Sequence, residues 1–195
     1  MNNDEKVIRN PMGISKIYTM TECAIFAALL CIFSPITVPI GPIPISMGLF
    51  AVMLTAVILG WKKGVLSVIV YLLIGLCGVP LFSGGKGGLA AFVGPTGGYI
   101  WSYVLMAIVI GFLSQKEWKN KILSILIPFL ACLLGIIICY TLGTIQFMNV
   151  ANYSLTKALA VCVYPFIPLD LLKALGAALL GTGVRKNLNR IGLLS

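Results

Sequence analysis

The sequence predicts an all-α integral membrane protein with six transmembrane helices. Of its 195 residues, 59% are hydrophobic and only 10% are charged, and the mean hydropathy is +1.06. Soluble domains carry about 25% charged residues, so this composition suits a surface that faces lipid. The apolar runs are hydrophobic on every side, whereas strands of a membrane barrel alternate with a period of two, so helices are favoured.

Six apolar segments supply these helices. A spanning helix takes about 20 residues, so we expect a single transmembrane domain over residues 1–195 with no room for a nucleotide-binding domain. If the protein does work that needs ATP, another chain must supply it. The segments cover approximately 17–33, 46–60, 64–77, 97–113, 122–145 and 166–184.

The basic residues predict an orientation with both termini in the cytoplasm. Positive side chains gather in cytoplasmic loops of membrane proteins. With a cytoplasmic N-terminus, external loops hold only Lys86 and Lys157, and Lys173 lies inside the last helix. The net charge of +9 is then explained by the cytoplasmic segments, which hold Lys6, Arg9, Lys16, Lys62, Lys63, Lys116, Lys119, Lys121, Arg185, Lys186 and Arg190. A multi-pass membrane protein with both termini on the cytoplasmic side fits this pattern.

Several functional classes are disfavoured. The chain has no histidine, which excludes histidine-based catalysis and histidine metal ligands. Its six cysteines are scattered without a CxxC pair, so we expect no metal site and no disulfide framework. Basic residues do not alternate with aromatic residues outside the apolar segments, so no nucleic-acid partner is expected. We expect no catalytic residues and no cofactor.

The loops assigned to the outer face predict a covered ligand pocket. Loop 34–45 contains four prolines and no charge, and loop 79–96 reads VPLFSGGKGGLAAFVGPT. Irregular backbone is tolerated at membrane depth where it packs in protein or lines a cavity. We therefore expect these glycine- and proline-rich loops to fold back over the helix ends.

Asp170 and Lys173 are the strongest candidates for a ligand-binding pair. They lie three residues apart in the last apolar segment, so they share one helix face. An ionisable residue within a span usually faces the protein interior or a water-filled cavity. A carboxylate accepts from ligand N–H groups and an ammonium donates to a carbonyl or carboxylate. A structural ion pair, or a lysine that reaches the interface, is the alternative.

Two glycine motifs flank an apolar stretch and lead into the fourth segment. SGGKGG begins at Ser83 and GPTGG begins at Gly94. Glycine permits close backbone approach, and helix-start amides can hold a polar group, although loop packing alone would also explain the motifs. In the first segment, Ala24 and Ala28 form a small-xxx-small face that allows close helix packing, within the chain or with another subunit.

The chain resembles the biotin-specific substrate-binding (S) components of energy-coupling-factor (ECF) transporters, the BioY family. The resemblance covers about residues 20 to 185 and is carried by VPIGPIPIS, LLIGLCGVPLFSGGKGGLAAFVGPTGGYI and PFIPLDLLKA. It implies a prokaryotic plasma membrane and capture of biotin from outside, with uptake driven by a transmembrane coupling (T) subunit and two ATPases. It implies that Ala24 and Ala28 meet the coupling subunit. The ligand contacts it implies are Asp170, Lys173, Phe82, Ser83, Gly84, Gly85, Gly88, Gly94, Thr96, Gly97, Gly98 and Tyr99.

Within that resemblance, Asp170 and Lys173 hold the ureido ring, while Phe82 and Tyr99 flank the apolar part of the ligand. Other readings stay open from the residues alone. They are an S component for another small vitamin, a small polytopic membrane enzyme such as a lipid acyltransferase, and a channel. The lack of histidine and of carboxylate clusters disfavours the enzyme, and the lack of a filter-like sequence disfavours the channel.

Overall fold

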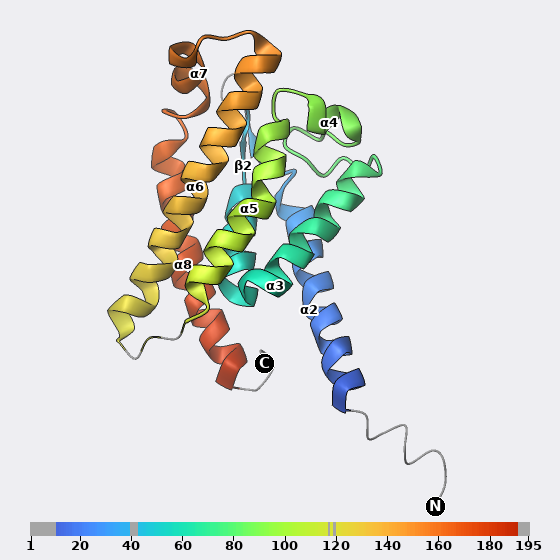
Figure 1. Ribbon diagram of the computed structural model, residues 1–195, viewed down its shortest axis with the longest axis vertical. Coiled ribbons are helices and arrows are strands. Elements are labelled where there is room, and N and C mark those ends of the chain that lie inside the picture. The colour runs from blue at the N-terminus through green and yellow to red at the C-terminus, as the bar shows by residue number, and fades with distance from the viewer. Residues whose placement is uncertain (1–10, 40–42, 117, 119, 191–195) are drawn as a thin grey trace, which may run out of the picture.

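The computed structural model describes residues 11–39, 43–116, 118 and 120–190 (Figure 1). Five helices in this part of the chain are long and apolar enough to cross a membrane. Among the basic residues used to predict the orientation, Lys6, Arg9 and Lys119 lie outside the described residues. The five helices are α2 (Pro11–Phe33), α3 (Gly48–Leu76), α5 (Gly97–Ser114), α6 (Lys121–Ala151) and α8 (Ile167–Arg190).

Three of these helices extend beyond the apolar segments that predicted them. Helix α2 begins at Pro11 rather than near residue 17, α6 continues to Ala151, and α8 continues to Arg190. Polar residues at a helix end keep the helical backbone while leaving the hydrocarbon region. Hydropathy therefore finds the part of a helix that lies in lipid and underestimates its full length.

The second and third predicted helices form one element, α3, which bends at Gly60. The sequence predicted a loop between two helices over residues 60–64. In the structure only Gly60 is non-helical there, with φ of 76° and ψ of −175°. Figure 1 shows the two arms of α3 diverging from the lower end of the bundle. Gly111 of α5 packs so closely against the bend that a Cβ there would overlap the backbone of Gly60 and Trp61. The arms are also close, since a Cβ at Gly64 would lie 3.3 Å from Ala56 Cα.

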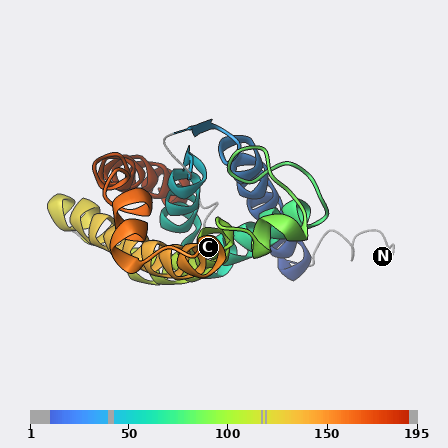
Figure 2. The same cartoon turned by 90° about the horizontal axis from the view of Figure 1, so that it is seen from above.

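Helix α3 is the centre of the bundle. It packs against α2, α5 and α8, and α6 covers α5 and α8. Seen from above, α2 (blue) and α8 (red) lie on opposite sides, with the first arm of α3 (cyan to teal) between them (Figure 2). Small residues make these contacts close: a Cβ at Gly135 of α6 would lie 2.6 Å from Ile110, and one at Gly181 of α8 would lie 2.7 Å from Val57. Such small-residue contacts are typical of helix packing in membranes.

The connections at the upper end in Figure 1 contain short elements that the sequence did not predict. Strands β1 (Thr37–Val38) and β2 (Ile45–Ser46) pair antiparallel within the proline-rich loop. Helix α4 (Leu89–Val93) follows the SGGKGG motif, and α7 (Leu155–Cys162) lies between α6 and α8. A small apolar cluster of Ile43, Ile45, Phe147, Ala158, Cys162, Val163 and Phe166 joins β2 and α7 to the tops of α6 and α8.

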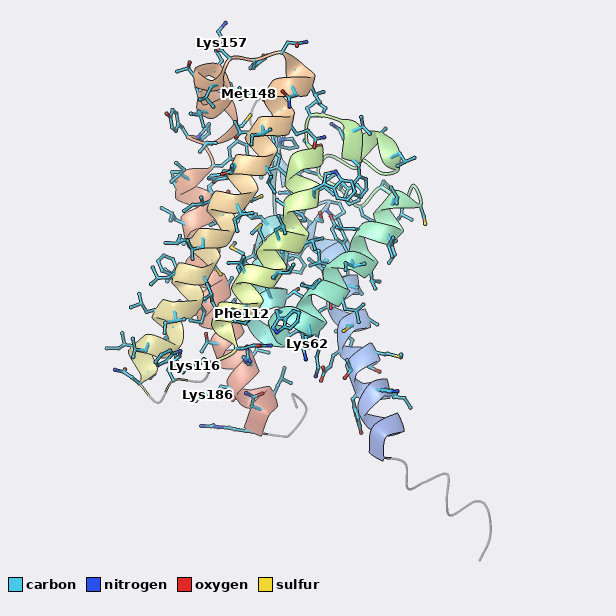
Figure 3. All side chains as sticks on the ribbon, in the orientation of Figure 1. Lys62, Phe112, Lys116, Met148, Lys157 and Lys186 are labelled. Atoms are coloured by element: carbon cyan, nitrogen blue, oxygen red, sulfur yellow. The ribbon has the colours of Figure 1, made fainter. Side chains whose placement is uncertain are left out.

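The described basic residues are unequally divided between the two ends. Lys62, Lys116 and Lys186 lie at the lower end in Figure 3, whereas Lys157 of α7 lies at the upper end. Near the lower end, Lys63 forms an ion pair of 2.8 Å with Glu22 of α2. The charge asymmetry predicted from the sequence is therefore an asymmetry between the two ends of the bundle.

Gly60→Ala should destabilise the protein, because its φ and ψ lie in a region that only glycine adopts readily. We expect the free energy of unfolding to fall by about 1–3 kcal/mol. Denaturant titration of the purified protein in mixed micelles measures this change. Gly183→Ala is the matched control, because a Cβ there meets nothing within 4 Å and helical alanine is favoured over glycine. Equal stability of G60A and G183A would contradict a strained bend.

Candidate functional site

An ion pair buried inside the bundle defines the candidate site. Asp170 is 3% exposed, although it lies in the first turn of a membrane-spanning helix. Lys173 Nζ donates to Asp170 Oδ1 at 2.9 Å, as the spacing of the two residues predicted. Lys173 also donates to the carbonyl oxygen of Ser46 in β2 at 2.9 Å, and the Tyr140 hydroxyl of α6 donates to Asp170 Oδ2 at 2.7 Å.

These partners leave hydrogen-bonding capacity at both charged groups. Each carboxylate oxygen can accept about two hydrogen bonds, and each oxygen of Asp170 has one partner from Lys173 or Tyr140. The Lys173 ammonium has three N–H groups and uses two of them. The pair can therefore accept further N–H donors and donate one further hydrogen bond.

The unused capacity faces a cavity that residues of the upper loops help to line, with about 600 Å³ of empty space when the open solvent at its entrance is included. Both charged residues contribute to its wall, and the rest of the wall is largely apolar and aromatic. Pockets for small molecules have this character, with a few polar groups that orient the ligand in apolar surroundings. The lining residues are Ser34, Ile43, Pro44, Ser46, Leu49, Tyr71, Phe82, Ser83, Thr96, Tyr99, Ile100, Tyr103, Cys139, Tyr140, Phe166, Asp170 and Lys173.

Two glycines place aromatic rings in this wall. A Cβ at Gly75 of α3 would overlap the ring of Phe82, and one at Gly143 of α6 would overlap the ring of Tyr99. Phe82 is only 1% exposed and packs edge-to-face on Tyr71, with 5.6 Å between the ring centroids. The Tyr71 hydroxyl lies 2.6 Å from Ser34 Oγ, which fixes this ring in turn. The rings of Phe82 and Tyr99 are therefore held in the wall by packing rather than free to move in the cavity.

The loop between α3 and α5 is attached to the bundle by a side chain of α6. Gln146 Nε2 donates to the carbonyl oxygens of Phe92 at 2.7 Å and of Gly94 at 2.9 Å. Ser83 Oγ donates weakly to the carbonyl oxygen of Pro44 at 3.4 Å, and both residues line the cavity. These contacts hold the glycine-rich and proline-rich loops beside one another.

The comparisons with known proteins agree with this geometry. The model of the BioY family matches residues 5–190. The chain belongs to the BioY family. It is 38% identical over 167 residues to the "Biotin transporter BioY" of Thermotoga maritima, with 86% of this chain and 95% of that protein covered. A second relative, the "Biotin transporter BioY" of Rhizobium etli, is 36% identical, with 83% and 89% covered.

A solved structure has the same fold as this BioY family chain. It is the crystal structure of "the S-component for biotin from an ECF-type ABC transporter". The TM-score is 0.76 at 31% sequence identity, and 95% of each chain is covered. The likeness therefore extends over the whole helical bundle, including the elements around the cavity.

Six residues predicted as ligand contacts of this BioY family member lie in the cavity wall: Phe82, Ser83, Thr96, Tyr99, Asp170 and Lys173. The six predicted glycine contacts do not line it. Gly84, Gly85 and Gly88 have φ of 75°, 70° and 73° and form the turns of the loop, with the Gly88 amide donating to the Gly75 carbonyl.

The second glycine motif packs helices together instead of facing the cavity. A Cβ at Gly97 would overlap the Phe92 carbonyl, and one at Gly98 would overlap the Leu142 carbonyl of α6. Gly94 accepts the Gln146 hydrogen bond through its own carbonyl oxygen. The sequence correctly indicated positions of close backbone approach, but the neighbour that approaches is the protein itself.

Sequence reasoning missed several wall residues, of which Tyr140, Ser46 and Tyr71 matter most. Tyr140 lies in the middle of α6 and was hidden in an apolar run, although a tyrosine there must place its hydroxyl against a partner. Ser46 contributes a backbone carbonyl, which carries no sequence signal. Not every aromatic residue near this end belongs to the wall, since Trp101 and Tyr164 are 56% and 61% exposed and are not among the lining residues.

Ala24 and Ala28 both lie on the exposed face of α2, while Ala27 between them is buried against the bundle. The described part of α2 contacts the rest of the chain through α3. The small-residue face is therefore turned away from this chain's own helices. Its use by a partner stays a prediction.

Gln146→Leu should release the loop between α3 and α5, because two backbone carbonyls lose their donor. At about 1 kcal/mol per hydrogen bond, losing two bonds amounts to about 2 kcal/mol, so we expect amide exchange in residues 89–97 to become roughly 30-fold faster. Hydrogen–deuterium exchange with mass spectrometry of that peptide measures the effect. Asn149→Leu, an exposed amide on the same helix, is the control. Unchanged exchange in Q146L would show that the loop is held by other contacts.

Proposed function

We propose that this protein is the biotin-binding S component of an ECF-type ABC importer. It captures biotin from outside the cell for ATP-driven uptake by partner subunits and is a transport component rather than an enzyme. The observation that carries the proposal is the buried Asp170–Lys173 pair in the wall of an apolar cavity. The family membership and the relatives named as biotin transporters support it.

The ureido ring of biotin matches the unused capacity of the pair. This ring offers two N–H donors and one carbonyl acceptor in one plane. The Asp170 carboxylate accepts from one N–H group, and the remaining N–H of Lys173 donates to the carbonyl beside it. Tyr140 holds the carboxylate in place from the opposite side through its hydroxyl at 2.7 Å. The apolar remainder of biotin lies against Phe82 and Tyr99, the two rings fixed by neighbouring glycines.

A purely structural ion pair is the main competing reading. Burying two charges is costly unless their hydrogen bonds are satisfied, and replacing a buried pair with apolar residues is often neutral or stabilising. A pair kept only for stability has no reason to line a cavity with donors and acceptors unused. An S component for another small vitamin would keep the pair but require a different ring shape, which ligand competition distinguishes.

We also propose six membrane passages, in which each arm of α3 counts separately because the chain turns at Gly60. The proline-rich segment with β1 and β2 and the loop carrying α4 then cover the cavity on the outer side. The end with Lys62, Lys116 and Lys186 faces the cytoplasm, in keeping with the positive-inside rule.

Uptake then requires other subunits. We propose a transmembrane coupling subunit and two cytoplasmic ATPases as partners, with the exposed Ala24 and Ala28 face of α2 as the contact with the coupling subunit. Small residues let two helices approach closely in lipid, where van der Waals contact replaces the hydrophobic effect as a driving force.

Asp170→Asn should abolish tight binding of labelled biotin by the purified protein in detergent. The variant loses charge-assisted hydrogen bonds worth about 1.5–3 kcal/mol each, so we expect the Kd to rise by at least about 100-fold. Lys157→Met removes a lysine at the same end of the bundle but away from the cavity and should bind normally. Wild-type affinity in D170N would overturn the proposal, as would stronger competition by another vitamin.

The double variant Asp170→Leu with Lys173→Met separates binding from folding. An apolar pair of similar volume should preserve or raise the thermal unfolding midpoint, because no charge is left buried without a partner. We expect this variant to fold and to bind no biotin. A folded double variant that still binds biotin would assign recognition to other residues.

The orientation is tested by labelling single cysteines in intact cells. In a background with all six native cysteines replaced by serine or alanine, a membrane-impermeant maleimide should label Lys157→Cys. It should leave Lys116→Cys unlabelled until the cells are opened. The reversed pattern would place the cavity on the cytoplasmic side.

A further inference from the structure

A second cavity lies at the opposite end of the bundle from the first, with about 470 Å³ of empty space when the open solvent at its entrance is included. It is formed where α5 ends, α6 begins and the last turns of α8 pass between them. Figure 3 shows two of its lysines, Lys116 and Lys186, close together at the lower end. The described lining residues are Val57, Ser114, Lys116, Trp118, Ser124, Pro128, Thr182, Arg185 and Lys186.

Every charged side chain among these lining residues is basic. Arg185 is fixed in the wall, because its guanidinium donates to the carbonyl oxygens of Val57 and Ser114, both at 3.1 Å. Lys116 extends over the Trp118 ring, with its ammonium 4.6 Å from the ring centroid. Lys186 is exposed and lies one residue beyond Arg185 on α8. The cavity therefore combines one rigid and two adaptable positive groups.

Two buried donors in the same wall have no hydrogen-bond partner. They are Ser114 Oγ, in a residue that is 6% exposed, and the indole Nε1 of Trp118. Buried donors are nearly always paired in proteins, because leaving one unpaired is costly. The neighbouring hydroxyls of Ser124 and Thr182 already donate to the carbonyls of Trp118 and Ser124. A ligand with several acceptor oxygens would pair these two donors, and its negative charge would balance the basic side chains.

We propose that this cavity binds the phosphate of an anionic phospholipid from the inner leaflet. A phosphodiester supplies acceptor oxygens for Ser114 and Trp118 and a negative charge for Lys116 and Lys186. Basic pockets between transmembrane helices at the cytoplasmic surface bind anionic headgroups in this way.

A membrane lipid fits better than a free phosphate ion because of the surrounding surface. The site lies at the ends of membrane-spanning helices, where headgroups lie, and tryptophan is enriched at that level. Phe112 of α5 is 66% exposed, and Leu126 of α6 is 43% exposed. The helices that form the cavity therefore also expose apolar side chains at this end of the bundle, as helices in contact with lipid do.

The test is lipid binding to the full-length purified protein in neutral detergent. Phosphatidylglycerol is titrated against phosphatidylcholine, which carries the same phosphate without net charge, and bound lipid is counted by native mass spectrometry. We expect selective retention of phosphatidylglycerol. Lys116→Gln combined with Lys186→Gln should weaken it by about fivefold for each lysine removed. Lys157→Gln, a lysine at the other end, is the matched control.

Ser114→Ala tests the buried donor without changing charge. It should weaken phosphatidylglycerol binding severalfold and leave biotin binding unchanged, because the two cavities share no lining residue. Unchanged biotin binding also shows that each lysine variant is folded. Equal retention of both lipids, or wild-type retention by the double lysine variant, would overturn the proposal. Displacement of bound phosphatidylglycerol by millimolar inorganic phosphate would assign the site to a free anion instead.

Discussion

The Asp170–Lys173 pair constrains the whole arrangement, because two charges inside a membrane bundle must be surrounded by hydrogen-bond partners. Those partners come from separate elements. Tyr140 of α6 donates to the carboxylate, and the Ser46 carbonyl of β2 accepts from the ammonium. Satisfying the pair therefore brings α6, α8 and the proline-rich loop together around one point. The space left between them is the cavity of the candidate site.

Glycine supports this arrangement by giving volume to neighbouring aromatic rings. A Cβ at Gly75 would overlap Phe82, and one at Gly143 would overlap Tyr99. Each of these two helical glycines therefore leaves space for one ring of the cavity wall. The loop glycines act differently, because Gly84, Gly85 and Gly88 supply backbone turns with positive φ. The shape of the cavity is thus set in part by glycines that pack behind its wall.

The two ends of the bundle have opposite character for the same physical reason. At the upper end, residues of the connecting loops help to line the cavity, and its charges are buried and paired. At the lower end, the basic side chains are largely exposed, where water and headgroups stabilise them. Arg185 links this end to the core by donating to the last carbonyls of α5 and of the first arm of α3.

The sequence by itself determined the membrane class, the approximate helix positions and the shared face of Asp170 and Lys173. These follow from composition and from spacing along one helix, which are local properties. Only the tertiary structure decided that Tyr140 and Ser46, 30 and 127 residues away from their partners, complete the site. It also decided that the glycines of GPTGG pack against α6 and that the break near residue 60 is a single residue. Contacts between distant segments depend on how the helices pack. The pattern of apolar residues within one segment does not specify which other segment packs against it.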